Sequence, residues 1–303
     1  MTTADEPRRR WNIEEGAAGF GRALSSDEDV AQTNTHYDHP AEFFATITGG
    51  EWNTYSCNLW EPGATETQSQ ERKLDLLGEL LRLKPGMRVV DVGCGWGGPI
   101  VYLAKRFGIQ GTGLTPSANQ QVFGQHRADR HGVDVTIYCG HWREFEDAEP
   151  FDAVVTDEAI VHFNDLRGFF EKMRGLLKPD GLMLNKELHF ASSRTAIPTR
   201  AMVLINKSFG ETGNYRTLHD ELRSLDEAGF ELERLEQIDL RHYEKTLECW
   251  VANLQANRAR LEMLVGREMY SRFHTYFRIL RRGCAARLMT LDLVVARPSR
   301  QPG

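Results

Sequence analysis

The sequence predicts an α/β protein in which a seven-stranded, mostly parallel sheet is covered by helices on both faces. Three observations lead to this fold class. Strand-like and helix-like segments alternate between residues 71 and 190, a run of glycines follows the first strand-like segment, and two more strand-like segments follow later in the chain. Such alternation is typical of parallel sheets, because each parallel pair of strands needs a crossover connection.

Each element has its own local signal. The first helix has apolar residues at helical spacing and ends in Pro-Gly, the second ends in glycine, and the third begins with proline. The predicted helices in this region are residues 71–86, 99–108, 116–132 and 166–181. The predicted strands, all rich in β-branched or other apolar residues, are residues 87–93, 109–115, 133–140, 151–159, 182–190, 230–240 and 289–298.

Two further segments, residues 199–215 and 248–288, look helical but stand outside the alternation. We therefore predict that they are insertions that form a cap over the edge of the sheet. The resulting division of the chain is an N-terminal arm with lid helices at 1–70 and a sheet-based core at 71–303, with cap insertions at about 191–225 and 243–285.

The composition is that of a soluble globular protein, with 41% hydrophobic and 26% charged residues. The net charge of −6 argues against a general nucleic-acid-binding protein, and no apolar run approaches the roughly 20 residues that span a bilayer. The five cysteines contain no Cys-x-x-Cys pair, and the N-terminus lacks the apolar stretch of a secretory signal. These features predict a cytoplasmic protein without stable membrane insertion, and they leave a homo-oligomer open.

A glycine-rich segment, VVDVGCGWGG at residues 89–98, ends the first strand and begins the next helix. Ligands of open parallel sheets bind beyond the carboxyl ends of the strands, where this turn lies. Gly93, Gly95 and Gly97 would allow the backbone to approach a ligand closely. The segment also matches Gly-x-Gly-x-x-Gly, so a dinucleotide is a second interpretation, although the second strand ends in Thr115 rather than in the acidic residue that a dinucleotide expects.

Five motifs together resemble the cyclopropane fatty acid and mycolic acid synthases, which are class I methyltransferases dependent on S-adenosylmethionine (SAM). The motifs are HYDHPAEFF, TYSCNLW, VVDVGCGWGG, GLTPSANQ and HYEKTLECWVANLQANR, they stand in family order, and the similarity runs from about residue 36 to 297. The resemblance implies a Rossmann-like class I methyltransferase fold and SAM as the cofactor.

The resemblance also implies which residues contact SAM. Tyr55 and Ser56 would close over the methionine end, and Trp142 would stack beside the adenine, although Tyr55 and Trp142 could instead be ordinary packing residues. Family members have an acidic residue after this tryptophan, whereas this sequence has Arg143. The complete set of implied cofactor contacts is Tyr55, Ser56, Asp91, Gly93, Gly95, Thr115, Gln120, Trp142 and Asp157.

SAM carries an electrophilic methyl group, which an alkene can attack to give a carbocation that must then lose a proton. Such a site needs a dry apolar pocket, aromatic faces near the cation and one base. In the cyclopropane synthases the base is bicarbonate, which a polar shell holds. The resemblance assigns Cys57 and Tyr243 to this shell, but Val161 and Lys186 replace its glutamate and its histidine. We therefore do not expect cyclopropanation by the bicarbonate mechanism.

A different carboxylate, Glu158, follows the fourth strand at the ligand-binding end of the sheet. Its segment, TDEAIVHFNDL, resembles one in the terpenoid diphosphate C-methyltransferases, where a glutamate is the base. The resemblance thus implies Glu158, Tyr243 and Cys57 as catalytic residues, and proton loss to Glu158 would leave a methylated alkene rather than a ring. The alternative is that Glu158 caps the following helix, where a carboxylate is also favourable.

The predicted substrate contacts follow from the same resemblance. LINKSFGETGNYRTLHDEL resembles a helix of the terpenoid enzymes through Asn206 and Phe209. A prenyl diphosphate needs cations, and Arg278 and Arg282 share one helix face because they are four residues apart, although they could equally form a solvated face. His36 could help to place a Mg²⁺ ion on the diphosphate, but no spacing in the sequence identifies a metal site.

These observations predict a SAM-dependent C-methyltransferase that methylates a carbon–carbon double bond of an isoprenoid (a prenyl diphosphate) or a similar lipid-like small molecule in specialised metabolism. One alternative is a lipid methyltransferase that resembles the cyclopropane fatty acid synthases and acts on acyl chains. The others are an N- or O-methyltransferase of a small natural product and a SAM-binding protein without turnover.

Overall fold

One seven-stranded sheet, with the strand order β3-β2-β1-β4-β5-β7-β6, forms the centre of the protein. The computed structural model describes residues 25–28, 30–31, 39–195 and 216–300. The strands from β1 to β5 are parallel, whereas β7 is antiparallel to both of its neighbours, so the predicted mostly parallel sheet is confirmed. The strands are β1 (Arg88–Val92), β2 (Gln110–Thr115), β3 (Val135–Cys139), β4 (Phe151–Asp157), β5 (Leu177–Phe190), β6 (Phe230–Ile238) and β7 (Met289–Pro298).

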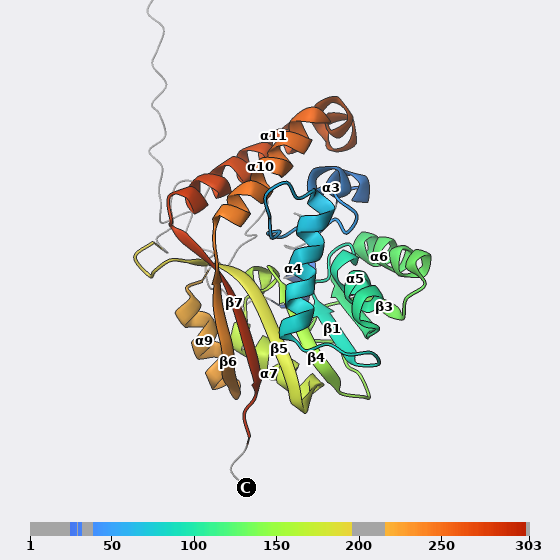
Figure 1. Ribbon diagram of the computed structural model, residues 1–303, viewed down its shortest axis with the longest axis vertical. Coiled ribbons are helices and arrows are strands. Elements are labelled where there is room, and N and C mark those ends of the chain that lie inside the picture. The colour runs from blue at the N-terminus through green and yellow to red at the C-terminus, as the bar shows by residue number, and fades with distance from the viewer. Residues whose placement is uncertain (1–24, 29, 32–38, 196–215, 301–303) are drawn as a thin grey trace, which may run out of the picture.

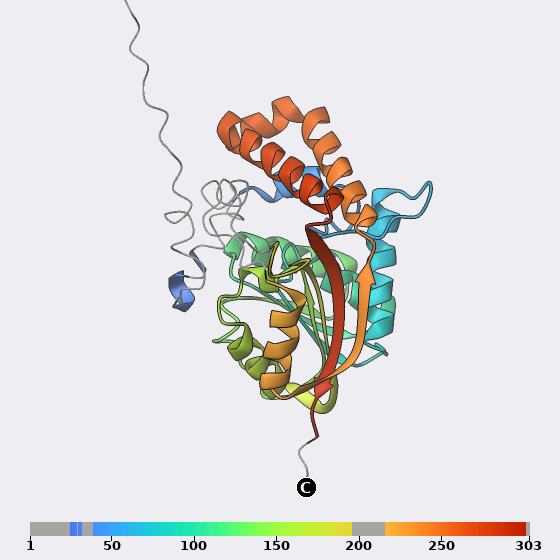
Figure 2. The same ribbon diagram turned by 90° about the vertical axis from the view of Figure 1, so that its left-hand side faces the viewer.

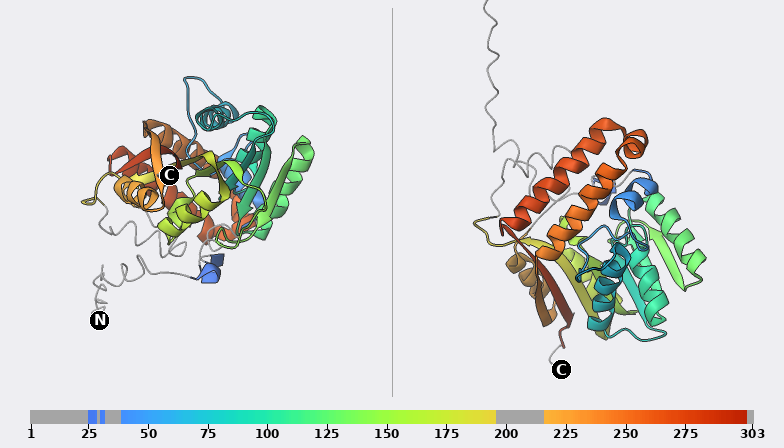
Figure 3. Two further views of the ribbon diagram at one scale, coloured as in Figure 1. Left: turned by 90° about the horizontal axis from the view of Figure 1, so that it is seen from below. Right: turned by 45° about the horizontal axis from the view of Figure 1, so that its top comes forward.

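Helices cover both faces and one end of the sheet (Figures 1 and 3). One face carries α4 (Glu66–Leu80), α5 (Gly98–Phe107) and α6 (Ala118–His131), and the other carries α7 (Leu166–Leu176) and α9 (Leu218–Glu227). Successive residues of β1 alternate between these layers: Val89 belongs to the apolar core of the first face and Val90 to that of the second. Both valines are fully buried, which explains why two successive residues of β1 are apolar.

A third group of helices lies over the carboxyl ends of the parallel strands (Figures 1 and 2). It consists of α3 (Ala41–Thr48) and of α10 (Arg241–Ala256) and α11 (Arg258–Ala285), which connect β6 to β7. The pair α10 and α11 matches the cap predicted at 243–285. Its inner face is aromatic, because Phe273 and Phe277 are fully buried and pack toward α3.

Two predicted boundaries differ from the structure. The helix predicted to begin at 71 begins at Glu66, inside the predicted N-terminal arm, because Thr65 and Gln68 form a reciprocal capping box at its start. The predicted cap range 191–225 includes most of α9, which instead packs against α7 and β6 on the face of the sheet. The rest of that range lies largely outside the described residues. No helix among the described residues is both long and apolar enough to cross a membrane.

Candidate active site

The glycine turn after β1 forms the floor of the site. Gly93, Gly95 and Gly97 have φ angles of 84°, 53° and 74°, which favour glycine. A Cβ atom at Gly97 would lie 2.8 Å from the Cα atom of Gly124 on α6, so this glycine allows α5 and α6 to pack closely. A Cβ atom at Gly95 would meet nothing within 4 Å, because Gly95 lines an open pocket.

This pocket lies at the carboxyl ends of β1, β2 and β4. It brings together all nine predicted cofactor contacts, which come from six separate stretches of the chain: Tyr55, Ser56, Asp91, Gly93, Gly95, Thr115, Gln120, Trp142 and Asp157. Glu158 lines the same pocket. The lining also includes residues that the sequence did not single out, among them Asn53, Trp96, His141, His162 and Phe163.

Two buried polar atoms in the pocket fit a cofactor that carries cationic and hydrogen-bonding groups. Burial and the charge of Asp157 raise the pKa of Asp91 to about 8, and its Oδ2 atom has no hydrogen-bond partner among the described residues. The Nε1 atom of Trp142 is likewise buried and unpartnered in the described part of the chain. Because an unpaired buried polar atom costs about 1–3 kcal/mol, a ligand that paired these two atoms would be favoured. The groups of SAM meet this requirement.

Arg143 stands where the family has an acidic residue. Its guanidinium lies over the ring of Trp142, 4.8 Å from the centroid, and pairs with Asp165 at 3.2 Å. Asp165 is also the residue that caps α7, because its side chain accepts a hydrogen bond from the backbone N–H of Gly168 at 2.9 Å. Arg143 therefore covers the tryptophan ring from outside, and it is half-buried.

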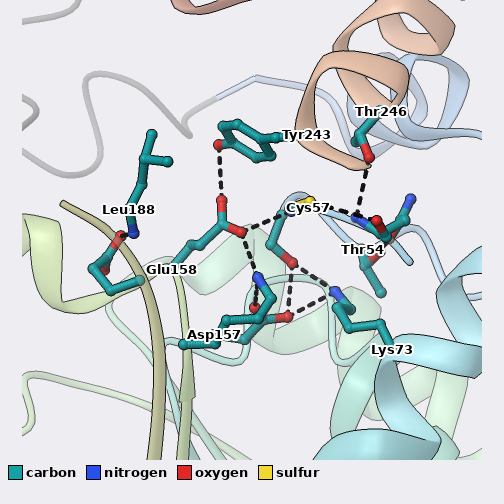
Figure 4. A network of polar contacts seen from close by, with 12 residues as sticks. Thr54, Cys57, Lys73, Asp157, Glu158, Leu188, Tyr243 and Thr246 are labelled. Carbon is teal, nitrogen blue, oxygen red and sulfur yellow. Dashed lines mark hydrogen bonds and ion pairs between the residues drawn. The ribbon is translucent and has the colours of Figure 1, made fainter. Parts of the chain in front are cut away.

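Glu158 lies immediately after β4, in a backbone conformation with φ = 59° that non-glycine residues rarely adopt. Its backbone N–H donates to the carbonyl of Lys186 at 2.7 Å. Its Oε1 atom accepts hydrogen bonds from the backbone N–H of Cys57 at 2.8 Å and from the amine of Lys186, and its Oε2 atom accepts one from the hydroxyl of Tyr243 at 2.8 Å (Figure 4). Since Asp165 caps α7, the alternative interpretation of Glu158 as a helix cap is wrong.

Glu158 belongs to a buried network of two lysines and two acids (Figure 4). Lys73 on α4 donates to Ser56 and to Asp157 Oδ2, each at 2.7 Å, and Ser56 also donates to Asp157 Oδ2 at 2.7 Å. Lys186 lies 2.7 Å from Asp157 Oδ1 and also pairs with Glu158. Both lysine side chains are fully buried, and each is paired with Asp157. Burial lowers the pKa of Lys73, and the charge of Asp157 offsets this only in part.

The network fixes the protonation states of its members. Burial alone would lower the pKa of Lys186, but the charges of Asp157 and Glu158 outweigh it and raise that pKa above its usual range. The same lysines, Lys186 first, outweigh burial at Asp157 and lower the pKa of its carboxyl. Burial raises the pKa of the Cys57 thiol well above its usual range. Cys57 therefore contributes its backbone N–H to the site rather than a thiolate.

An aromatic cluster connects the pocket to the cap helices. Tyr55, from the pocket wall, stacks on Trp250 of α10 with 5.0 Å between ring centroids and 19° between planes. The edge of Tyr55 also meets Phe44 of α3 at 5.2 Å, and Phe277 of α11 lies 5.3 Å from Trp250. The cap thus holds the pocket residue Tyr55 through rings from three helices, and these rings keep water from that side of the pocket.

The predicted substrate contacts are not brought together by the described structure. Arg278 and Arg282 are exposed on α11 and are not among the residues that line the described pocket. His36, Asn206 and Phe209 lie outside the described residues. No group of three or more histidine, cysteine, aspartate or glutamate side chains in the described ranges is arranged to hold a metal ion.

Lys73 is the functional candidate that the sequence did not single out. A signal for it exists, since Lys73 shares the apolar stripe of α4 with Leu74, Leu77 and Leu81, where a charged residue is unexpected. A fully buried lysine on such a stripe must meet a partner. In the structure this partner is Asp157.

The parallel sheet, the glycine turn and the pocket at the carboxyl end of β1 define a class I SAM-dependent methyltransferase. The chain belongs to the mycolic acid cyclopropane synthetase family, because the model of that family matches residues 24–294. The predicted resemblance to the cyclopropane and mycolic acid synthases, the fold and the enzyme class are therefore confirmed.

Relatives and solved structures agree with this assignment. The chain is 29% identical over 287 residues to methoxy mycolic acid synthase MmaA3 of Mycobacterium tuberculosis. This alignment covers 90% of this chain and 94% of that protein. It is 30% identical over 269 residues to cyclopropane mycolic acid synthase 1 of the same species, with coverages of 84% and 91%. Its fold is similar to those of the cyclopropane synthase MmaA2 from Mycobacterium tuberculosis and of the mycolic acid cyclopropane synthase CmaA1 complexed with SAH and CTAB. Both have a TM-score of 0.82 over 88% of this chain and 98% of the other, with 25% and 26% identity.

Proposed function

We propose that this enzyme transfers the methyl group of SAM to a carbon–carbon double bond of a lipid-like substrate, and that Glu158 removes the proton that completes the reaction. The observation that carries the proposal is the environment of Glu158, whose carboxylate accepts from the N–H of Cys57 and from the hydroxyl of Tyr243. By the resemblance described above, the corresponding cysteine and tyrosine of the cyclopropane synthases hold bicarbonate. A carboxylate of the chain itself thus takes the place of a diffusible one.

The two carboxylate oxygens of Glu158 have different roles. Oε1 is held by two donors, the Cys57 N–H and the Lys186 amine, whereas Oε2 accepts from Tyr243. A carboxylate oxygen offers two lone pairs, so Oε2 has the freer lone pair and is the atom that takes the proton. The hydroxyl of Tyr243 then holds the carboxyl group in place while it changes charge.

The remaining chemistry also fits residues of the pocket. Bound SAM supplies the electrophilic methyl group. Tyr55, Trp96, Trp142 and Phe163 line the pocket with aromatic rings, which exclude water and present faces that favour a nearby cation. Ser56 and Asp157, which line the cofactor pocket, are tied directly to the network that holds the base.

An acyl chain is the substrate class that the comparisons favour. The named relatives are mycolic acid synthases, and CmaA1 has been solved with SAH and CTAB. For the prenyl diphosphate interpretation, the described structure adds no support, since Arg278 and Arg282 do not line the described pocket. The isoprenoid and its Mg²⁺ ion therefore stay a prediction, which the same assay tests.

The experiment that tests the function is methyl transfer from SAM that carries a trideuterated methyl group. The substrates are an unsaturated phospholipid, an unsaturated acyl thioester and geranyl diphosphate, each with and without Mg²⁺. A methylated product from either acyl substrate without Mg²⁺ supports the proposal. A product only from geranyl diphosphate would replace the acyl chain with the isoprenoid, and products only from added amines or phenols would refute alkene methylation.

The deuterium content of the product tests the role of the base. Loss of a proton from the substrate chain leaves all three deuterons in a methylated alkene, whereas loss from the transferred methyl group leaves two, in a ring or an exocyclic methylene. The sequence-based expectation is the methylated alkene. In either case the product should disappear in Glu158→Gln and persist in Glu187→Gln, which changes a buried glutamate that does not line the cofactor pocket. The same rate in both variants would remove Glu158 as the base.

A further inference from the structure

Lys186 is a fully buried lysine on β5, the strand that pairs with β4. Its Cα atom is paired in register with Asp157, the last residue of β4, and its amine lies 2.7 Å from Asp157 Oδ1. The amine also donates to Glu158 Oε1. Two neighbouring acids of one strand end therefore share a single amine of the adjacent strand.

The sequence departs from its family at both ends of this contact. The resemblance places a histidine of the bicarbonate shell at position 186 and assigns the base to a diffusible ion. Here the base is proposed to be Glu158, and the residue opposite it is a lysine. The two departures are electrostatically complementary, since a permanent carboxylate in a dry site needs a permanent positive charge.

Several charged or titratable groups lie around Glu158. Lys186 and Lys73 carry the positive charges, and Asp157 is the nearest acid. Glu187 on β5, Cys57, Tyr243 on α10 and Cys284 on α11 also face it, and the charge of Glu158 contributes to raising the pKa values of Glu187, Cys57 and Cys284. Of the two lysines, only Lys186 donates a hydrogen bond to Glu158, whereas Lys73 donates to Ser56 and Asp157.

We propose that Lys186 is a positioning residue that pairs with the carboxylate of Glu158 and keeps it aimed into the pocket, so that this carboxylate can act as the resident base. The proposal rests on the proposed function for its catalytic consequence. When Glu158 takes the proton, Lys186 keeps its ion pair with Asp157, so no buried amine is left without a partner. Lys186 stays charged throughout, because its pKa is raised, and it neither gives nor takes the proton.

The matched pair of variants is Lys186→Met and Lys73→Met, because both lysines are fully buried and both pair with Asp157. An opposite charge within hydrogen-bond distance moves a carboxyl titration by about one to three pH units. In Lys186→Met, the acid limb of the rate profile should therefore move to higher pH. In Lys73→Met the acid limb should move less, because Lys73 donates to Asp157 and not to Glu158, while affinity for SAH falls because Ser56 and Asp157 line the cofactor pocket.

A double variant separates positioning from general stability. If Lys186 acts through Glu158, adding Lys186→Met to Glu158→Gln should change the residual rate by no more than about twofold. An acid limb that stays in place in Lys186→Met, or a double variant whose losses multiply, would overturn the proposal. If Lys186→Met does not fold, as judged by circular dichroism and SAH calorimetry, Lys186→Gln keeps a hydrogen-bond donor without the charge and is tested against the same expectation.

A measurement without substrate keeps this proposal separate from the proposed function. The protein is labelled with ¹³C at the glutamate carboxyl carbons, and the Glu158 resonance is assigned by its absence in Glu158→Gln. Its titration midpoint should move to higher pH in the Lys186 variants and move less in Lys73→Met, which keeps the hydrogen bond from Lys186. Unchanged midpoints would refute the role of Lys186 even in an active enzyme. A moved midpoint in a protein that methylates no alkene would refute the function and leave the pairing intact.

Discussion

Glu158→Gln is the substitution that most directly tests the active site. Glutamine has nearly the same shape, and its amide oxygen can accept from the Cys57 N–H and the Lys186 amine, while its amide nitrogen can donate to the Tyr243 oxygen. The geometry should therefore survive, but the side chain can no longer take a proton. Loss of a positioned general base costs about 10²–10⁴-fold in rate, so we expect turnover to fall by about that factor.

The cost in stability should be smaller than the cost of breaking an isolated buried ion pair. Removal of one partner of such a pair costs about 3–5 kcal/mol. Lys186 would still have Asp157 at 2.7 Å, so we expect the free energy of unfolding to fall by about 1–3 kcal/mol. Urea titration measures this loss, SAH calorimetry should show little change in affinity, and rapid-quench turnover with trideuterated SAM measures the rate.

The control for this prediction is Glu187→Gln. Glu187 is also buried, and its carboxylate accepts from the backbone N–H groups of Val161 at 3.1 Å and Leu188 at 2.9 Å. Burial and the charge of Glu158 raise the pKa of Glu187 to about 8, so Glu187→Gln changes the charge little at pH 7, and it removes one of the two backbone hydrogen bonds. The reasoning is refuted if Glu158→Gln turns over at a rate near that of Glu187→Gln while both bind SAH.

Three further outcomes are expected. Gly95→Asp should abolish SAH binding in calorimetry, because the new side chain enters the pocket from a residue with φ = 53°, and unchanged affinity would contradict the cofactor assignment. Tyr243→Phe should lower turnover by about 10- to 100-fold without changing SAH affinity, since it removes a charge-assisted hydrogen bond of about 1.5–3 kcal/mol from Glu158 Oε2. Burial alone would lower the pKa of His189, but hydrogen bonds that its ring donates to Asp292 and Glu221 outweigh burial and raise this pKa from 6.5 to about 10 in the folded state. The resulting stabilisation is full below pH 6.5 and is lost as the pH rises through about 10, so the stability advantage of the wild type over His189→Gln in urea titrations should shrink across this range. A constant difference would show that His189 is not charged in the folded protein.

The fold was largely predictable because local patterns and the global sheet agree. Val89 and Val90 are both buried, on opposite faces, and successive apolar residues in a strand are typical of a parallel sheet with two helical layers. Two predicted boundaries differed from the structure, at the start of α4 and at α9, and only the first has a local signal in the sequence. The capping box at Thr65 and Gln68 is visible in the sequence, although it precedes the apolar periodicity by which the helix was recognised. For α9, periodicity alone could not decide which surface the helix covers.

The site was predictable one residue at a time but not as a network. Motif resemblance identified Ser56, Asp157 and Glu158. In the structure all three line the pocket that the glycine segment also lines. It did not identify how they are connected. The contact between Asp157 and Lys186 depends on the register of β4 against β5, and Lys73 reaches the same acid from a helix that precedes the whole sheet. Such contacts depend on tertiary packing, which spacing along the sequence does not report.

The network also explains why a resident base needs more than a glutamate. A diffusible bicarbonate brings its charge with it and can leave again, so its shell can be neutral. A glutamate is always present, and in the empty pocket its charge would be unpaired unless the protein supplied a cation. Lys186 supplies it, Asp157 holds Lys186 when Glu158 becomes neutral, and Lys73 balances Asp157. Each of these side chains needs the next one as its partner, so Glu158, Lys186, Asp157 and Lys73 form one unit. Introducing a glutamate alone into a bicarbonate-dependent relative should therefore fail to create a base unless a lysine is introduced opposite it.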